Sequence, residues 1–420
     1  MKKDTNLFEN KEEQNKGNLL IIFFAYYIAI FIPQILHIPT SINTLYKGAI
    51  LLIFLGYFLI RYMRFKISLK PIMLALILFL IQIISFCYSL KFIEYNKYIN
   101  DNINIIILPL YIIIFYSILH DKGVNKHDLC KFIKYFIVFM IIACVVNIIM
   151  NIHNITNFFS ITTGYEYNMA SFFDNRNTFG IYLSYAIIGG VYVRGFEQKK
   201  YIDFVLVLLL MNLLLTLSRT AIISTCVFLL SYYLIISKNI ISKLVIIITL
   251  SCIVYIGLSI DSVSNFLYNV LFRVESGTAG RDEVWLSALN FYTENNIFFG
   301  TGYGVGSTYM DNMTLHKSFH NGYISTLVTG GIALSIFYLL LIVYTVRINL
   351  KILKVDHVMG AYFIGIMICY LISALTEENV LLTSSGLSFL ISIFVLILPK
   401  LYYNSLKKNG REQILSRKEL

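Results

Sequence analysis

Three basic side chains stand where a helix is expected to begin, and they could take part in chemistry. Arg219 lies where two apolar runs meet almost without a loop between them. Arg281 follows a turn-forming stretch and leads into a predicted helix over 282–295, whose first residues are acidic as helix starts prefer. His320 stands just before an apolar run that starts after Gly322. Each side chain is therefore expected beside a loop, near the end of a helix.

These residue types point to phosphate binding and proton transfer. A guanidinium presents a planar fork that matches phosphate oxygens, so Arg219 is a candidate for holding a phosphate group. An imidazole, with an unperturbed pKa of ~6.5, can accept a proton at neutral pH, so His320 is a candidate general base. Structural alternatives stay open: Arg219 reaching lipid head groups, Arg281 in a salt bridge, and His320 as a hydrogen-bonded anchor.

Other polar residues accompany these three. Arg176 and Asn177 open another apolar run, and Asn177 or Thr178 is expected to cap its helix. Glu377 stands in a short acidic segment between the last two apolar runs, where a carboxylate could hold an arginine or bind sugar hydroxyls. The candidate substrate-binding residues are Arg176, Asn177, Tyr303, Asn321 and Glu377.

The segment Gly300–Gly306 alternates glycine with other residues and contains Tyr303. No strand precedes it and no Lys-Ser/Thr pair follows, so it does not fit a nucleotide phosphate loop. We interpret it as a tight turn that could also approach a substrate closely. His316 and His320 have helical i, i+4 spacing, but no glutamate of the His-Glu-x-x-His type and no third ligand accompany them. We therefore expect no metal site.

The composition indicates what positions these residues. The 420 residues are 58% hydrophobic and 14% charged, with a mean hydropathy of +0.73. Soluble chains are about 45–50% apolar, so this is an integral membrane protein. The net charge of +11 comes from small basic clusters between apolar runs, which argues against a nucleic-acid surface. Five of the six cysteines lie inside apolar runs, so no disulfide framework is expected.

The predicted fold is all-α, with about twelve transmembrane helices, because a bilayer core needs about 20 helical residues per crossing. The polar segment 1–18 and the tail 404–420 are predicted to be cytoplasmic, and 19–403 forms one membrane domain. Only eight of the 34 Lys and Arg residues then fall outside, as the positive-inside rule requires. The predicted spans are 19–36, 43–60, 71–90, 103–119, 132–150, 178–193, 201–217, 220–236, 240–259, 321–346, 358–376 and 381–402.

This topology places the candidate residues on the external face. The two long mixed segments, about 151–177 and 260–320, are both external, and the second joins helices 9 and 10. A transporter or a flippase for lipid-linked oligosaccharides is an alternative, but it should carry ionisable residues along its spans. Here the spans are almost free of charge and the charges gather at the outer boundary, which favours an enzyme.

The order of these motifs resembles the bacterial O-antigen ligase and Wzy-type polysaccharide polymerase family of membrane proteins. The resemblance runs from Phe173 to about Tyr344. Each motif is weak alone, whereas their order and the large external loop are more specific. The motifs are Phe173–Asn177, Leu217–Thr220, Gly280–Arg281 ahead of Trp285, Gly300–Gly304 and His320–Tyr323.

The resemblance implies an activity and roles for residues. Such proteins transfer a glycan from an undecaprenyl diphosphate carrier to an acceptor hydroxyl on the outer face of the bacterial cytoplasmic membrane, without cofactor or metal. Arg219 and Arg281 correspond to the arginines that hold the diphosphate, and His320 to the histidine that activates the acceptor. Inversion at the sugar is expected. Arg176 departs from relatives, which often carry a less polar residue there.

The same residues would serve a polymerase, which extends a carrier-linked repeat unit, or a ligase, which transfers the glycan to a lipid A core or another acceptor. The abundance of Ile, Asn, Lys, Tyr and Phe suggests an AT-rich genome, and many such bacteria lack lipopolysaccharide. We therefore expect a polymerase of capsule, exopolysaccharide or O-antigen synthesis. Its expected partners are the carrier-linked oligosaccharide, the bilayer, and a flippase and a chain-length regulator of the same pathway.

Overall fold

The computed structural model describes most of the chain from residue 69 onward. The predicted N-terminal segment 1–18, the spans 19–36, 43–60 and 103–119, and the tail beyond 407 lie wholly or mostly outside the described residues. The described stretches are 69–92, 105–110, 126–156, 169–237, 239–271, 280–306, 318–383 and 385–407, with a few single residues besides.

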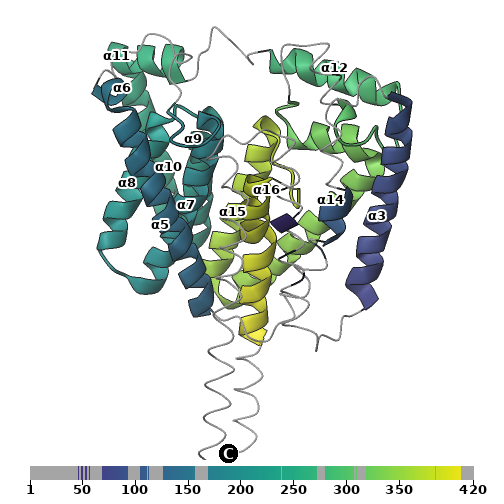
Figure 1. The fold of residues 1–420 in the computed structure, drawn as a ribbon. Helices are drawn as coiled ribbons and strands as arrows, with labels where there is room; N and C mark the ends of the chain where they lie inside the picture. Colours follow the sequence, from purple (N-terminus) through teal and green to yellow (C-terminus); the bar gives the residue numbers. More distant parts are fainter. Residues whose placement is uncertain are drawn as a thin grey trace, which may run out of the picture. The chain divides into compact units, whose positions relative to one another are not determined.

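Nine predicted spans fall in the described part, and all nine are helical (Figure 1). Within that part, seven helices are long and apolar enough to cross a membrane, while α8 and the apolar part of α10 are shorter. The protein is therefore an all-helical, multi-pass membrane protein, and the full number of twelve spans stays a prediction. The helices are α3 Leu69–Ser89, α5 Lys126–Met150, α7 Arg176–Glu197, α8 Tyr201–Leu215, α9 Arg219–Ile236, α10 Ile240–Ser259, α14 Gly322–Val355, α15 His357–Thr376 and α16 Gly386–Ser392.

The last of these helices continues through a π-helical turn at Ile393–Ile397 and ends near Lys407. Shorter helices occupy the connections: α6 Ile152–Thr156, α11 Asp261–Asn265 with a π-helical turn at Phe266–Leu271, and α12 Arg281–Thr293. The chain divides into two compact units. The first contains the residues up to Phe132, Glu283–Ile348 and the residues from Ala374 onward, and the second contains Ile133–Asp282 and Asn349–Ser373.

In the second unit, α7 packs against α8 and α9. Gly180 lies so close to α9 that a Cβ there would come within 2.8 Å of Ser218. One turn further along, the Ser184 hydroxyl donates to the carbonyl of Ala221 at 3.0 Å. Small and hydroxyl-bearing residues are what lets helix backbones approach closely in a bilayer. The starts of α7 and α9 consequently lie together.

In the first unit, α14 is broken near its start. Gly331 has φ 64° and ψ −162°, a backbone conformation that is open essentially only to glycine. An unbroken helix would bond the N–H groups of Ile332 and Ala333 to the carbonyls of Val328 and Thr329. The break leaves all four groups without their helical partners.

The segment 297–302 supplies those partners. Thr301 and Gly302 donate their N–H groups to the carbonyls of Val328 and Thr329 at 2.8 and 3.0 Å. In return, the N–H groups of Ile332 and Ala333 donate to the carbonyls of residues 297 and 298, each at 3.0 Å. A broken membrane helix is tolerated where its backbone groups are satisfied inside the protein. The glycine-rich segment is thus a loop that pairs with α14, not only the external turn expected from the sequence.

Replacing Gly331 by Ala should destabilise this pairing. A Cβ at this position would come within 2.5 Å of the backbone of Phe298, and the positive φ would strain any side chain. We expect the apparent Tm of the detergent-solubilised protein to fall by several degrees. Gly195→Ala in α7 is the matched control, because nothing lies within 4 Å of a Cβ there. Equal Tm values for the two variants would contradict the claim that position 331 requires glycine.

Helix α12 buries one face against the paired loop and α14. Its buried side chains, Val284, Ala288, Phe291 and Tyr292, recur at helical spacing and pack in one cluster with Phe319 and Val328. The sequence predicts an apolar stripe of Trp285, Ala288, Leu289 and Tyr292 that lies on the membrane face or packs on other helices. Ala288 and Tyr292 are buried in the cluster and Trp285 packs against it, whereas Leu289 is 37% exposed. The face lies slightly further round the helix, toward Val284 and Phe291.

Candidate functional site

His320 lies in a short loop at the start of α14, as predicted, and its backbone is in the left-handed region with φ 47°. Few residues other than glycine adopt this conformation, and such residues cluster at functional sites. The preceding residue, Phe319, is 2% exposed and belongs to the buried cluster under α12. Phe319 fixes the loop, so the imidazole of His320 extends from a firmly held backbone.

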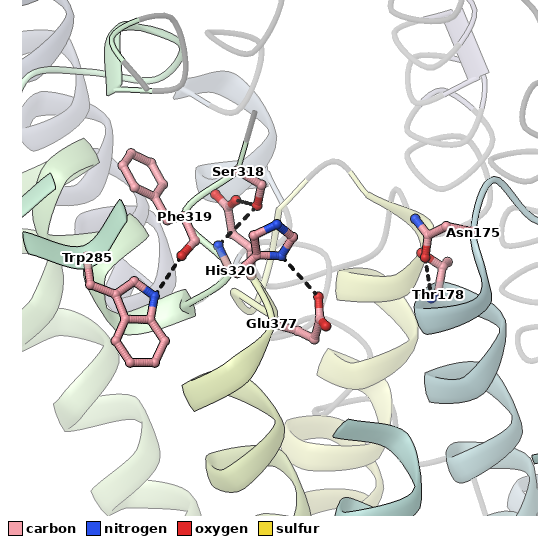
Figure 2. Close-up of polar contacts among 8 residues, drawn as sticks. Asn175, Thr178, Trp285, Ser318, Phe319, His320 and Glu377 are labelled. Atoms are coloured by element: carbon pink, nitrogen blue, oxygen red, sulfur yellow. Dashed lines mark hydrogen bonds and ion pairs between the residues drawn. The ribbon is translucent and has the colours of Figure 1, made fainter. Parts of the chain in front are cut away.

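Two contacts hold this loop in place (Figure 2). The indole N–H of Trp285 donates to the carbonyl of Phe319 at 2.9 Å, and the backbone N–H of His320 donates to the hydroxyl of Ser318 at 3.2 Å. The sequence placed Trp285 in an apolar stripe and did not predict this polar role. A partly buried indole N–H usually finds an acceptor, and this general preference could have suggested the hydrogen bond.

Asn321 caps α14. Its side-chain oxygen accepts hydrogen bonds from the N–H groups of Tyr323 and Ile324 at 2.9 and 3.1 Å. Gly322 then packs closely against the segment after α15, since a Cβ there would meet the backbone of Asn379 at 3.3 Å. The contacts of Asn321 are therefore those of a helix cap, and its binding of substrate stays a prediction.

Glu377 lies beside His320. Its Oε2 atom is 3.7 Å from Nδ1 of the imidazole, and the two side chains are 13% and 28% exposed (Figure 2). This separation exceeds a hydrogen bond but is short enough for an ion pair once the imidazole is protonated. The structure thus brings together two of the candidate residues that lie 57 positions apart in the sequence.

Glu378, which was not among the candidate residues predicted from the sequence, is linked by hydrogen bonds to two serines. Its carboxylate accepts a hydrogen bond from the Ser318 hydroxyl at 2.7 Å and another from the Ser325 hydroxyl. Ser318 also accepts from the backbone of His320, so Glu378 is linked to the histidine loop through one hydroxyl. Two adjacent glutamates were visible in the sequence, but only the fold shows that each has a separate partner.

Tyr303 lies in the loop that pairs with α14. The side-chain amide of Gln82 in α3 donates to its hydroxyl at 3.3 Å. Burial raises the pKa of this phenol well above its ordinary value, although the hydrogen bond from Gln82 acts in the opposite direction. Tyr303 therefore stays neutral at physiological pH and keeps its hydroxyl proton for hydrogen bonding.

Arg219 is the first residue of α9, in the second unit. Leu217, two residues earlier, has φ 49°, and Ser218 is fully buried. The backbone is therefore sharply turned where α8 gives way to α9, and Arg219 emerges from that turn half-buried. This is the position that the sequence predicted.

Arg176 and Asn177 are the first two residues of α7, and both are half-buried. The helix cap is Asn175, whose side-chain oxygen accepts from the N–H of Thr178 at 2.8 Å (Figure 2). The prediction that Asn177 or Thr178 caps this helix was therefore wrong, because the turn begins two residues earlier than the polarity pattern suggested. Since the starts of α7 and α9 lie together, Arg176 shares the end of the second unit that carries Arg219.

Arg281 is the first residue of α12 and follows Gly280, which has φ 77°. The predicted loop-to-helix junction is confirmed, with the helix one residue longer at its start. The candidate residues thus fall into two groups. His320, Asn321, Tyr303 and Glu377 belong to the first unit, and Arg176, Asn177, Arg219 and Arg281 belong to the second.

Residues 204–339 match the family model described as O-antigen ligase, Wzy_C. Over these residues, about a third of the chain, the protein is similar to the O-antigen ligase family. A comparison with curated proteins gives no match. The O-antigen ligase match confirms the resemblance over most of its expected length. It includes Arg219, Arg281, Tyr303, His320 and Asn321, and it ends before Glu377.

The similarity to the O-antigen ligase family agrees with the apolar helices. The family carries out membrane glycosyl transfer of the O-antigen ligase and polysaccharide polymerase type, on lipid-linked glycans. Arg176 and Asn177 precede the matched residues. The matched residues therefore include three of the basic candidates, Arg219, Arg281 and His320. Glu377 lies outside the match but close to His320.

Proposed function

We propose that this protein polymerises a surface polysaccharide by inverting transfer from an undecaprenyl diphosphate carrier to a carrier-linked repeat unit, on the outer face of the cytoplasmic membrane. An acceptor hydroxyl attacks the anomeric carbon of the donor sugar, and a new C–O bond forms. The bond to the diphosphate breaks, and its electron pair leaves with the diphosphate. His320 takes the hydroxyl proton, so no cofactor or metal is required by this scheme.

The proposal rests chiefly on the position of His320 within the O-antigen ligase match. It stands at the start of a helix in a strained backbone, with a carboxylate 3.7 Å from its ring. A general base becomes cationic when it accepts a proton, and the carboxylate of Glu377 would stabilise that cation. The same carboxylate would favour one orientation of the ring.

Arg219 and Arg281 are proposed to bind the diphosphate. Each is the first residue of its helix, where the N–H groups and the helix dipole already favour an anion. A cation at that position opposes the dipole, so it adds little to helix stability. It is instead well suited to an anionic ligand, and it would stabilise the charge that develops on the departing diphosphate.

Transfer to a different acceptor is the second candidate function. The family description, O-antigen ligase, favours a ligase. The composition favours a polymerase, because it suggests a bacterium without lipopolysaccharide. The two candidates differ in the acceptor alone.

One experiment tests both candidates. Purified protein is incubated with a single carrier-linked repeat unit as sole substrate, and the products are resolved by length. A ladder that depends on His320 is the expected result. Absence of a ladder with the cognate repeat would contradict the polymerase and direct the search to a separate ligase acceptor, or to transport of the lipid-linked glycan.

Glu377→Gln should reduce turnover moderately. The substitution keeps the shape of the side chain but removes the charge near His320, and a partly exposed ion pair is worth up to about 1 kcal/mol, or about fivefold in rate. Initial rates at saturating substrate measure this effect. Glu294→Gln, at an exposed position after α12, is the control and should retain the wild-type rate. A wild-type rate for Glu377→Gln would remove Glu377 from the mechanism.

A further inference from the structure

A cavity of about 280 Å³ lies within the first unit, next to the histidine loop. It is bounded by the glycine-rich loop, by the broken part of α14 and by the segment that follows α15. Phe319, the residue before His320, forms part of its wall. The polar residues that line it are Tyr303, Ser325, Thr326, Thr329, Glu378, Thr383 and Ser385.

The lining has a definite chemistry. Hydroxyl groups predominate, one carboxylate is present, and Phe319, Leu334 and Val380 add apolar surface. Among the described residues that line the cavity there is no Lys, Arg or His, so it has no cation to pair with a phosphate. Hydroxyls and a carboxylate beside an apolar wall suit a ring that carries several hydroxyl groups and no charge.

The size of the cavity further limits the ligands that it could bind. Pockets for drug-sized molecules enclose about 300–1,000 Å³. A cavity of about 280 Å³ is therefore suited to a small ligand, on the scale of one sugar ring rather than a whole oligosaccharide. A longer glycan would have to extend beyond it.

We propose that this cavity binds one uncharged sugar ring of the acceptor glycan, and that Glu378 is a specificity-determining residue which accepts hydrogen bonds from the ring hydroxyls. The proposal rests on the proposed function only in assigning the ring to the acceptor. A carboxylate has about four acceptor positions, and Ser318 and Ser325 use two of them. The remaining capacity suits a ligand that donates.

The contacts of Glu378 favour the acceptor over the donor. Glu378 follows Glu377, whose carboxylate lies 3.7 Å from the His320 ring, and Ser318 joins Glu378 to the His320 backbone. A ring in this cavity would thus be bound by the residues that hold the proposed base. The acceptor is the substrate whose hydroxyl must meet that base.

Direct binding provides the first arm of the test. The probe is the free repeat-unit oligosaccharide, released from its carrier, titrated into the full-length protein by calorimetry. Glu378→Gln should raise the Kd about tenfold, as expected for losing a hydrogen bond to a charged group. Glu294→Gln, at an exposed position after α12, should leave the Kd unchanged. An unchanged Kd for folded Glu378→Gln would overturn the proposal.

The second arm separates the two sources of the sugar. In transfer assays with an elongated donor and a carrier-linked acceptor, Glu378→Gln should raise the KM for the acceptor and leave the KM for the donor near the wild-type value. A rise in the donor KM alone would overturn the acceptor assignment. If Glu378→Gln folds poorly, Ser325→Ala provides a milder variant. Its control is Ser405→Ala, because the Ser405 hydroxyl donates to the carbonyl of Tyr402 in its own helix.

The two proposals can fail separately. Oligosaccharide binding that depends on Glu378, without any transfer activity, would support the cavity and contradict the proposed reaction. The opposite outcome is transfer that depends on His320, with an oligosaccharide Kd and an acceptor KM that do not change on substitution of Glu378 or Ser325. That outcome would support the reaction and overturn the cavity assignment.

Discussion

His320→Asn should lower the rate of transfer by roughly 10²- to 10⁴-fold, the range expected for removal of a general base. Asparagine is the informative substitution because it tolerates the left-handed backbone that His320 adopts, with φ 47°. The side chain loses its basic nitrogen while the loop keeps its conformation. Single-turnover rates with carrier-linked substrate measure the effect directly.

A matched histidine elsewhere controls for this prediction. His357 is the first residue of α15, and His357→Asn should retain wild-type activity. His320→Val should lower the yield of folded protein as well as the activity, because a β-branched residue is strained in this backbone region. Full transfer by correctly expressed His320→Asn would show that another group accepts the proton.

Arg281→Lys should lower transfer roughly 10- to 100-fold, although the charge is retained. Lysine offers a point charge in place of the planar fork that matches two phosphate oxygens, so stabilisation of the departing diphosphate should weaken. The reduction should appear in kcat, because the diphosphate gains charge in the transition state. Initial rates over a range of donor concentrations separate kcat from KM.

Arg194→Lys is the control for Arg281→Lys. Arg194 lies at the end of α7 and pairs with Asp203 at 2.6 Å in an exposed position, where such pairs contribute little. Its replacement should leave kcat near the wild-type value. Unchanged kcat for Arg281→Lys would mean that Arg281 supplies only structure or a general positive field.

Hydropathy and charge were sufficient to predict the described helices. Nine apolar runs became helices, although α5 begins six residues before its predicted start and α14 ends nine residues after its predicted end. Arg219, Arg281 and His320 lie at or just before helix starts, as expected. These features are local: a run of apolar side chains favours a helix wherever it lies. The same locality explains the error at the start of α7, because Asn175, Asn177 and Thr178 are all good caps and only the backbone selects between them.

The contacts that build the site could not be predicted, because they join distant segments. Gly330–Gly331 is a pair at which a helix can break, but the sequence does not show that a segment about thirty positions earlier supplies the missing hydrogen bonds. Glu378 was passed over for Glu377, and their separate roles depend on Ser318 and Ser325 being brought to them by the fold. Trp285 was interpreted as apolar for the same reason.

The pairing between residues 297–302 and α14 has a consequence for biogenesis. The N–H groups of Ile332 and Ala333 depend on carbonyls outside their own helix, and such groups are costly in lipid. We therefore expect α14 to enter the bilayer as a continuous helix and to break at Gly331 when the loop at 297–302 docks. Maturation then has two stages, and an antibody epitope or protease site near residues 297–302 should be accessible in nascent chains and protected in the finished protein.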